Sequence, residues 1–183
     1  MLRATSLLFV LAPAAGLCQT PDFAGTWKLN ERRSSVSLEA PLAGLIGAGA
    51  PGTLHITQPA NGTLVVESQV NESHARLYVP GETTTTAVFL GAGGTITMTS
   101  RWEQQTLVSE GTRESSSGPP SKVLEVFKLS ADGQTLELEV TVEGTPETSS
   151  SAFSSALSYT RIQDVGPCDS WPSPCKDFSR PRP

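Results

Sequence analysis

The two histidines, His55 and His74, are the first side chains to consider as metal ligands. They lie in separate segments, and no carboxylate stands at a repeated spacing that would complete a coordination set with them. In each segment the histidine alternates with apolar neighbours, which predicts that both imidazoles lie on the protein surface. We therefore predict no metal site and no cofactor, with a metal held between the two histidines as the alternative.

Serine and glutamate are more abundant, but neither type is placed for catalysis. No serine lies in a Gly-x-Ser-x-Gly turn, the arrangement that exposes a nucleophile between a strand and a helix. Glu137, Glu139 and Glu143 alternate with apolar residues, so they share an exposed face. We predict no catalytic residue and no enzymatic activity.

The first 18 residues have the order of a secretory signal peptide. A basic residue, Arg3, precedes an apolar run, and small residues follow that run. We expect cleavage after Cys18, which leaves Gln19 first; cleavage after Ala14 and lipidation of Cys18 are the alternatives. The chain is therefore predicted to be exported to a periplasm or to the extracellular space.

Two further cysteines, Cys168 and Cys175, lie near the C-terminus. Their spacing is longer than that of the Cys-x-x-Cys turns that bind zinc or exchange thiols. Disulfides persist in exported proteins, so we predict a disulfide that clips a Pro-rich tail at residues 163–183.

The overall composition excludes some classes of partner. The chain has 13 Lys and Arg against 18 Asp and Glu, a net charge of −5, and it has no basic stripe that could displace counterions from a phosphate backbone. Nucleic acid is therefore not an expected partner. After the first 18 residues, no apolar run is long enough to form a transmembrane helix.

Most of the chain alternates between apolar and polar residues, the period of a β-strand with one buried face. Residues 134–143 show it best, and Asp132-Gly133 before them is a pair suited to a tight hairpin turn. The same pattern predicts ten strands, at residues 23–30, 53–58, 63–70, 74–79, 84–90, 95–103, 106–113, 122–129, 134–143 and 154–162.

Short turns between consecutive strands predict that neighbours in sequence are neighbours in space. An open sheet of that size would leave two long edges, so we predict an all-β, up-and-down antiparallel barrel over residues 19–162, with a Greek-key sandwich as the alternative. The apolar spacing in residues 36–46 predicts a short helical or irregular insertion after the first strand, which could act as a lid or as a plug.

Two short motifs resemble one known group of proteins. Gly25-x-Trp27 in the first strand, and Tyr159-x-Arg161 in the last, resemble the opening and closing strands of the lipocalin and fatty-acid-binding superfamily, especially its secreted bacterial lipocalin-like domains. The resemblance implies a ligand-binding barrel in which Arg161 packs over Trp27 as a structural pair.

The barrel interior is where a function is expected. We predict an exported protein that binds a small hydrophobic or amphipathic ligand, lined by Val88, Met98, Trp102 and Phe127. A ligand-free interaction protein of the cell envelope, acting through the insertion or the tail, is the alternative, because the sequence leaves open whether the interior is hollow or filled. The strand pattern points these side chains inward: Leu64, Val66, Leu77, Val79, Val88, Leu90, Ile96, Met98, Trp102, Phe127, Leu129, Leu136, Leu138, Val140 and Val142.

Overall fold

The computed structural model describes seven stretches of the chain. They are residues 20–37, 50–58, 62–68, 75–87, 94–115, 118–143 and 152–163. The predicted signal peptide, the predicted disulfide between Cys168 and Cys175, and the predicted positions of His74 and Val88 lie outside them. Within these stretches, no helix is long and apolar enough to cross a membrane.

The described chain is almost entirely β-structure. A single turn of 3-10 helix, η1 at Glu31–Arg33, follows the first strand. The prediction of an all-β protein with about ten strands is therefore confirmed, whereas most of the insertion predicted at residues 36–46 lies outside the described residues. The strands are β1 (Gly25–Leu29), β2 (Thr53–Thr57), β3 (Leu64–Ser68), β4 (Ala75–Tyr78), β5 (Thr83–Ala87), β6 (Thr95–Glu103), β7 (Thr106–Ser115), β8 (Gly118–Leu129), β9 (Thr135–Glu143) and β10 (Ala152–Gln163).

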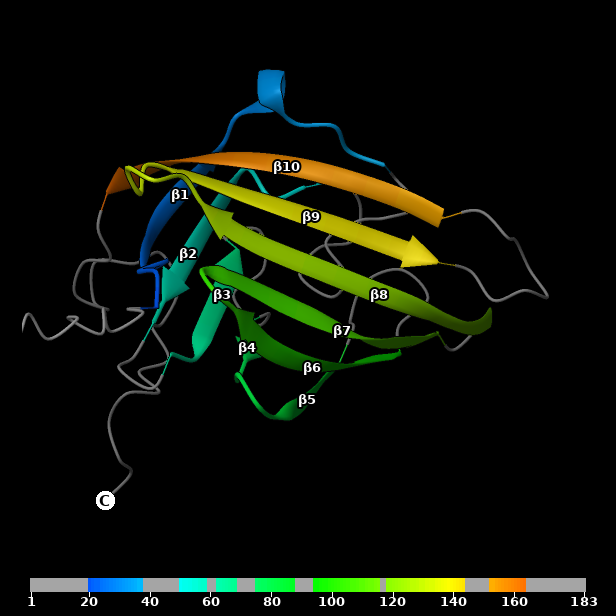
Figure 1. Cartoon of the computed structure of the whole chain (residues 1–183). Coiled ribbons are helices and arrows are strands. Elements are labelled where there is room, and N and C mark those ends of the chain that lie inside the picture. The colour runs from blue at the N-terminus through cyan, green and yellow to red at the C-terminus, as the bar shows by residue number, and fades with distance from the viewer. Residues whose placement is uncertain are drawn as a thin grey trace, which may run out of the picture.

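All ten strands form one antiparallel sheet that curls into a nearly closed barrel (Figure 1). The order β4-β3-β2-β1-β10-β9-β8-β7-β6-β5 follows the chain, with the first strand paired to the last. The two ends of this order, β4 and β5, are consecutive in sequence. The long strands β6 to β10 extend past the short strands β1 to β4 toward the right of Figure 1.

The seam between β4 and β5 is closed by a turn and a few hydrogen bonds rather than by a strand ladder. In the turn, the Glu82 amide donates to the Val79 carbonyl at 3.0 Å. The Thr84 hydroxyl donates to the Leu77 carbonyl across the seam, also at 3.0 Å. The seam is therefore the weakest line of backbone pairing around the barrel.

One end of the barrel is closed by aromatic side chains. The Trp27 indole is fully buried and donates to the Phe23 carbonyl at 3.0 Å, and the Phe23 and Trp102 rings lie 5.7 Å apart. The guanidinium carbon of Arg161 lies 4.6 Å from the centre of the Trp27 ring, and Arg161 also donates to the Asp22 carbonyl at 2.8 Å. Stacking of a guanidinium on indole stabilises the closure by roughly 0.5–2 kcal/mol.

The prediction that Leu77 and Val79 face the interior is wrong. Residues directly opposite one another in a ladder point to the same side of the sheet, and β4 pairs Arg76 with Val66 and Tyr78 with Leu64. Because Val66 and Leu64 are core residues, Arg76 and Tyr78 face inward. The apolar residues of this segment therefore mark the outer side of β4, and the inner side is polar.

Candidate functional site

A charged cluster lies inside the barrel and joins two strands that are not neighbours in the sheet. Arg76 Nη1 on β4 lies 2.7 Å from Glu125 Oε1 on β8, and the Tyr78 hydroxyl donates to Glu125 Oε2 at 2.9 Å. The Arg76 and Glu125 side chains are 2 % and 0 % exposed, and Tyr78 is also buried. We call Arg76, Tyr78 and Glu125 the interior cluster.

Alternation along β8 places the carboxylate. Val123, Glu125 and Phe127 are buried in turn, whereas Leu124 is exposed on the other side of the strand. A signal for Glu125 was present in the sequence, because the predicted inward position of Phe127 implies an inward position two residues earlier. Glu125 was not predicted as an inner residue, because the residues on both sides of it are apolar as well and the segment does not alternate cleanly.

Aromatic rings enclose the ion pair. The guanidinium carbon of Arg76 lies 5.2 Å from the centre of the Tyr78 ring, a cation–π contact. The Tyr78 ring in turn meets the Phe127 ring edge to face, with centroids 5.0 Å apart and planes at 70°. Phe127, predicted as a ligand-lining residue, therefore packs directly against the cluster.

Two buried hydroxyls lie at the same level of the sheet as the carboxylate. Ser100 on β6 is opposite Ser109 on β7, and Ser109 is opposite Glu125. The two hydroxyl oxygens are 2.6 Å apart, and both serines have no exposed surface. The interior thus holds a polar layer between apolar ones.

The local charges favour one protonation state of the cluster. Burial by itself lowers the pKa of Arg76, but the charge of Glu125, with the contribution of Tyr78, outweighs it and raises that pKa. Burial raises the pKa of Tyr78 well above its usual value, with Arg76 opposing and Glu125 reinforcing the shift. At neutral pH, Arg76 is therefore a cation and the Tyr78 hydroxyl is a hydrogen-bond donor.

The other predicted lining residues do not gather at this cluster. Met98 is buried opposite Gly111, at the inner position of β6 that precedes Ser100. Trp102 is only partly buried and lies with Phe23 at the closed end. Trp102 and Phe127 are both opposite Leu107 and so lie at one level of the sheet, whereas Met98 lies two inner positions away from Trp102 on β6.

The interior near the cluster is filled by the chain itself. Glu125, Phe127, Val140 and Tyr159 have no exposed surface, so no water-sized space adjoins them. Burial raises the pKa of the Tyr159 hydroxyl, and this buried group has no hydrogen-bond partner among the described residues. This part of the barrel is filled by side chains.

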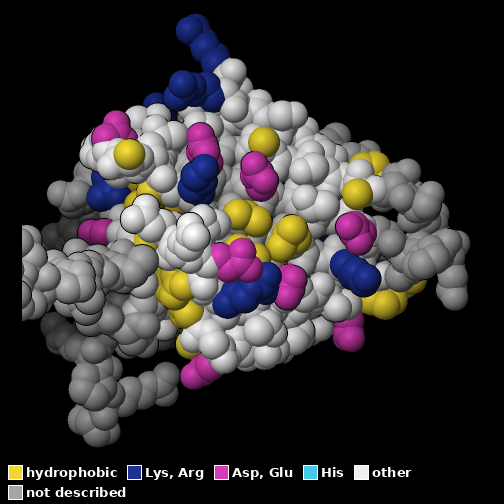
Figure 2. All heavy atoms as spheres, in the orientation of Figure 1, with side chains coloured by type: hydrophobic (Ala, Val, Ile, Leu, Met, Phe, Trp, Pro, Cys, Tyr) yellow, Lys and Arg dark blue, Asp and Glu magenta, His cyan; other side chains and the backbone are white. Residues whose placement is uncertain are grey.

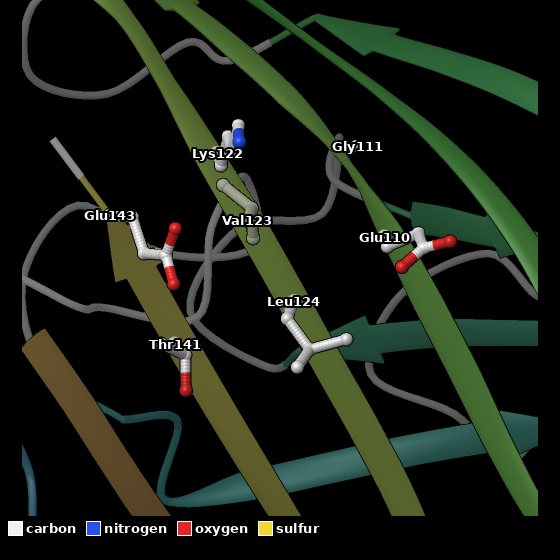
Figure 3. A pocket seen from close by; sticks show the side chains of 7 residues that line it. All are labelled: Glu110, Gly111, Lys122, Val123, Leu124, Thr141 and Glu143. Atoms are coloured by element: carbon white, nitrogen blue, oxygen red, sulfur yellow. The ribbon is translucent and has the colours of Figure 1, made fainter. Parts of the chain in front are cut away.

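Hollows lined by the described residues lie on the outside of the barrel. One of about 330 Å³ is formed over β7, β8 and β9, where Leu124 projects between the Glu110 and Glu143 carboxylates (Figure 3). These three side chains are exposed. On this side of the molecule, hydrophobic side chains lie among acidic and basic ones (Figure 2). None of the charged or polar side chains that line this hollow is buried as the interior cluster is.

The prediction that His55 lies on the surface is wrong in one respect. Its side chain is on the outer face of β2, as alternation requires, yet it is only 3 % exposed. His55 Nδ1 is 3.1 Å from the Thr26 hydroxyl oxygen, and burial lowers the pKa of the imidazole. In the part of the chain that the structure describes, no three His, Cys, Asp or Glu side chains are grouped to hold a metal ion.

Comparison with known proteins gives similarity to solved structures. No protein-family model and no curated protein matches the sequence. A solved structure titled "REP1-NXSQ fatty acid transporter" is similar, with a TM-score of 0.49 and 13 % sequence identity, over 78 % of this chain and 97 % of that chain.

Proposed function

We propose that this chain is an exported barrel that binds a small amphipathic molecule. The polar head of the ligand lies against the interior cluster, and its apolar part lies along the inner faces of β6 to β9. The observation that carries the proposal is the buried contact of Arg76 and Tyr78 with Glu125 inside a barrel whose core is mostly apolar.

Such a cluster is costly as a means of stabilising a fold. Removing two charges from water costs several kcal/mol per ion, and apolar residues of similar volume often serve a core equally well or better. Ligand pockets, by contrast, are mostly apolar with a few convergent polar groups. Arg76, Tyr78, Ser100, Ser109 and Glu125 form that pattern within one layer of the barrel.

The position of β4 supports a route by which the ligand reaches this layer. Two members of the interior cluster lie on this strand, which is four residues long and is an edge of the sheet. Because β4 and β5 share no strand ladder, β4 moves outward with the loss of few backbone hydrogen bonds. That movement uncovers Arg76 and Tyr78 and admits the ligand to the filled interior.

Export is part of the proposal and is supported by the signal-peptide order of residues 1–18. Its direct readout is the mass of the mature protein, which we expect to begin at Gln19.

The binding function is tested by displacement of the uncharged dye Nile red with 1-dodecanol from the purified exported chain. We expect saturable dye binding and displacement by the alcohol. The double variant Arg76→Met, Glu125→Leu leaves no uncompensated buried charge, so we expect it to fold and to lose affinity for 1-dodecanol by at least about tenfold.

The matched control is Arg101→Met, Glu110→Leu. It removes an ion pair with the same 2.7 Å separation, but from the exposed face of the barrel, where the side chains are 43 % and 59 % exposed. We expect unchanged affinity. A folded native chain that binds neither dye nor alcohol would contradict the proposal. Equal losses of affinity in both double variants would show that the head group does not lie at the interior cluster.

The closely filled interior favours one other candidate, a ligand-free interaction protein. A partner captured by the full chain and lost on deletion of residues 163–183, together with no dye binding, would support it.

A further inference from the structure

The charge balance of the interior cluster restricts the head group that the barrel can take. Arg76 brings one positive charge and Glu125 one negative charge, and the two groups are 2.7 Å apart with almost no exposed surface. Tyr78 adds a neutral hydroxyl donor to the same carboxylate. The Arg76–Glu125 pair is therefore neutral as a unit before any ligand binds.

Other described charges lie away from the interior cluster. Glu67 is buried, but it lies on the outer face of β3, because its chain neighbour Val66 points into the core. Arg113 is on the inner side of β7 and partly exposed, four residues beyond Ser109, which is roughly 13 Å along a strand. A ligand carboxylate at the cluster would face the Glu125 carboxylate. The Arg76 guanidinium that could attract the ligand is already paired with Glu125.

The hydrogen-bonding capacity of the head group also favours an uncharged ligand. A carboxylate only accepts hydrogen bonds and repels Glu125, whereas an ammonium group only donates and repels Arg76. A hydroxyl or an amide donates to the Glu125 carboxylate and accepts from the Arg76 guanidinium. An uncharged head of this kind joins the buried network without adding a net charge to it.

We propose that the barrel selects an uncharged amphipathic ligand whose head group is a hydroxyl or an amide, and that it discriminates against fatty-acid anions. This inference rests on the proposed function, because it specifies the ligand of the same interior site. The selectivity resides in Glu125, which occupies the guanidinium that would otherwise attract an anion.

The test compares three probes with the same twelve-carbon tail: 1-dodecanol, dodecanoate and dodecylammonium. At about pH 8 the second is an anion and the third a cation. Each displaces Nile red from the full exported chain below its critical micelle concentration. We expect the native chain to bind 1-dodecanol at least about tenfold more tightly than either ion.

Two single variants are expected to shift the preference among the three probes in opposite directions. Glu125→Gln leaves Arg76 uncompensated, so the ratio of dodecanoate affinity to 1-dodecanol affinity is expected to rise by at least about tenfold. Arg76→Met leaves Glu125 uncompensated and is expected to raise the relative affinity for dodecylammonium. Glu137→Gln, on the exposed side of β9, is the control and leaves the order of the three probes unchanged.

The outcomes separate this inference from the proposed function. A native chain that binds dodecanoate more tightly than 1-dodecanol overturns the selectivity and leaves a binding barrel. A folded native chain that binds none of the three probes overturns both. The native comparison stands by itself if a variant does not fold, as monitored by circular dichroism.

Discussion

Glu125 has no exposed surface and accepts hydrogen bonds from both Arg76 and Tyr78. An ion pair at such a position is stable only while both partners remain, since loss of one leaves a buried charge without compensation. This requirement makes Arg76 and Glu125 sensitive positions whatever the barrel binds. The buried contact of Ser100 with Ser109 lies beside this network, because Ser109 is opposite Glu125 in the ladder of β7 and β8.

His55 gives a prediction at this scale. Burial lowers its pKa in the folded state, whereas the unfolded chain has the ordinary value of about 6.5. The unfolded state therefore binds the proton more readily, and stability falls as the pH drops below about 6.5. The Thr26 hydroxyl oxygen lies 3.1 Å from His55 Nδ1, and Glu67 stands opposite His55 on β3.

Thermal unfolding followed between pH 7.5 and pH 5.5 measures this effect. We expect the acid-induced loss of stability to be smaller in His55→Asn than in the native chain, by on the order of 1 kcal/mol, or about 2–4 °C in Tm. Identical pH dependence in the two proteins would show that His55 does not contribute.

At the scale of elements, alternation along β8 and β9 and the turn between them follow directly from local sequence. Gly133 adopts a φ of 69° in this turn, and the Asp132 carboxylate accepts from the Ser130 hydroxyl and the Gln134 amide at 2.6 and 3.0 Å. Asp and Gly suit this geometry, so the hairpin is readable from the sequence. The orientation of β4 is not, because its register against β3 decides which face is buried.

Gly111 gives a prediction for the β6–β7 pair. A methyl group at this position would collide with the Thr97 carbonyl oxygen and lie 2.8 Å from the Met98 Cα, both atoms of the neighbouring backbone. We expect Gly111→Ala to destabilise the barrel by about 1–3 kcal/mol or more in urea unfolding.

Gly52→Ala is the matched control, since nothing lies within 4 Å of the added methyl group there. We expect its stability to stay within about 0.5 kcal/mol of the native value. Equal effects of the two substitutions would mean that β6 moves away from Gly111 without cost.

At the scale of the whole molecule, the barrel is held unevenly around its circumference. β7, β8 and β9 are long and paired on both sides, whereas β4 and β5 are short and each is paired on one side. Local opening free energies follow the number of backbone hydrogen bonds and buried contacts that must be lost. The seam is therefore the expected site of the first opening.

Hydrogen exchange followed by mass spectrometry tests this expectation. Amides of β4 and β5 should exchange well before those of β7, β8 and β9 under native conditions. Saturating 1-dodecanol should slow exchange at the seam if the ligand binds behind it. Uniform protection around the barrel would contradict opening at β4.

The class of the fold follows from local sequence alone, because period-two alternation and residues suited to tight turns are local properties and predict a meander of short strands. The sequence also placed Trp27 and Arg161 in the first and last strands, which pair in the barrel. The contact of Glu125 with Arg76 and Tyr78 could not be predicted locally and is seen only in the folded barrel. Their contact depends on the register of β4 and on closure of the sheet, which set burial and distance between residues almost fifty positions apart.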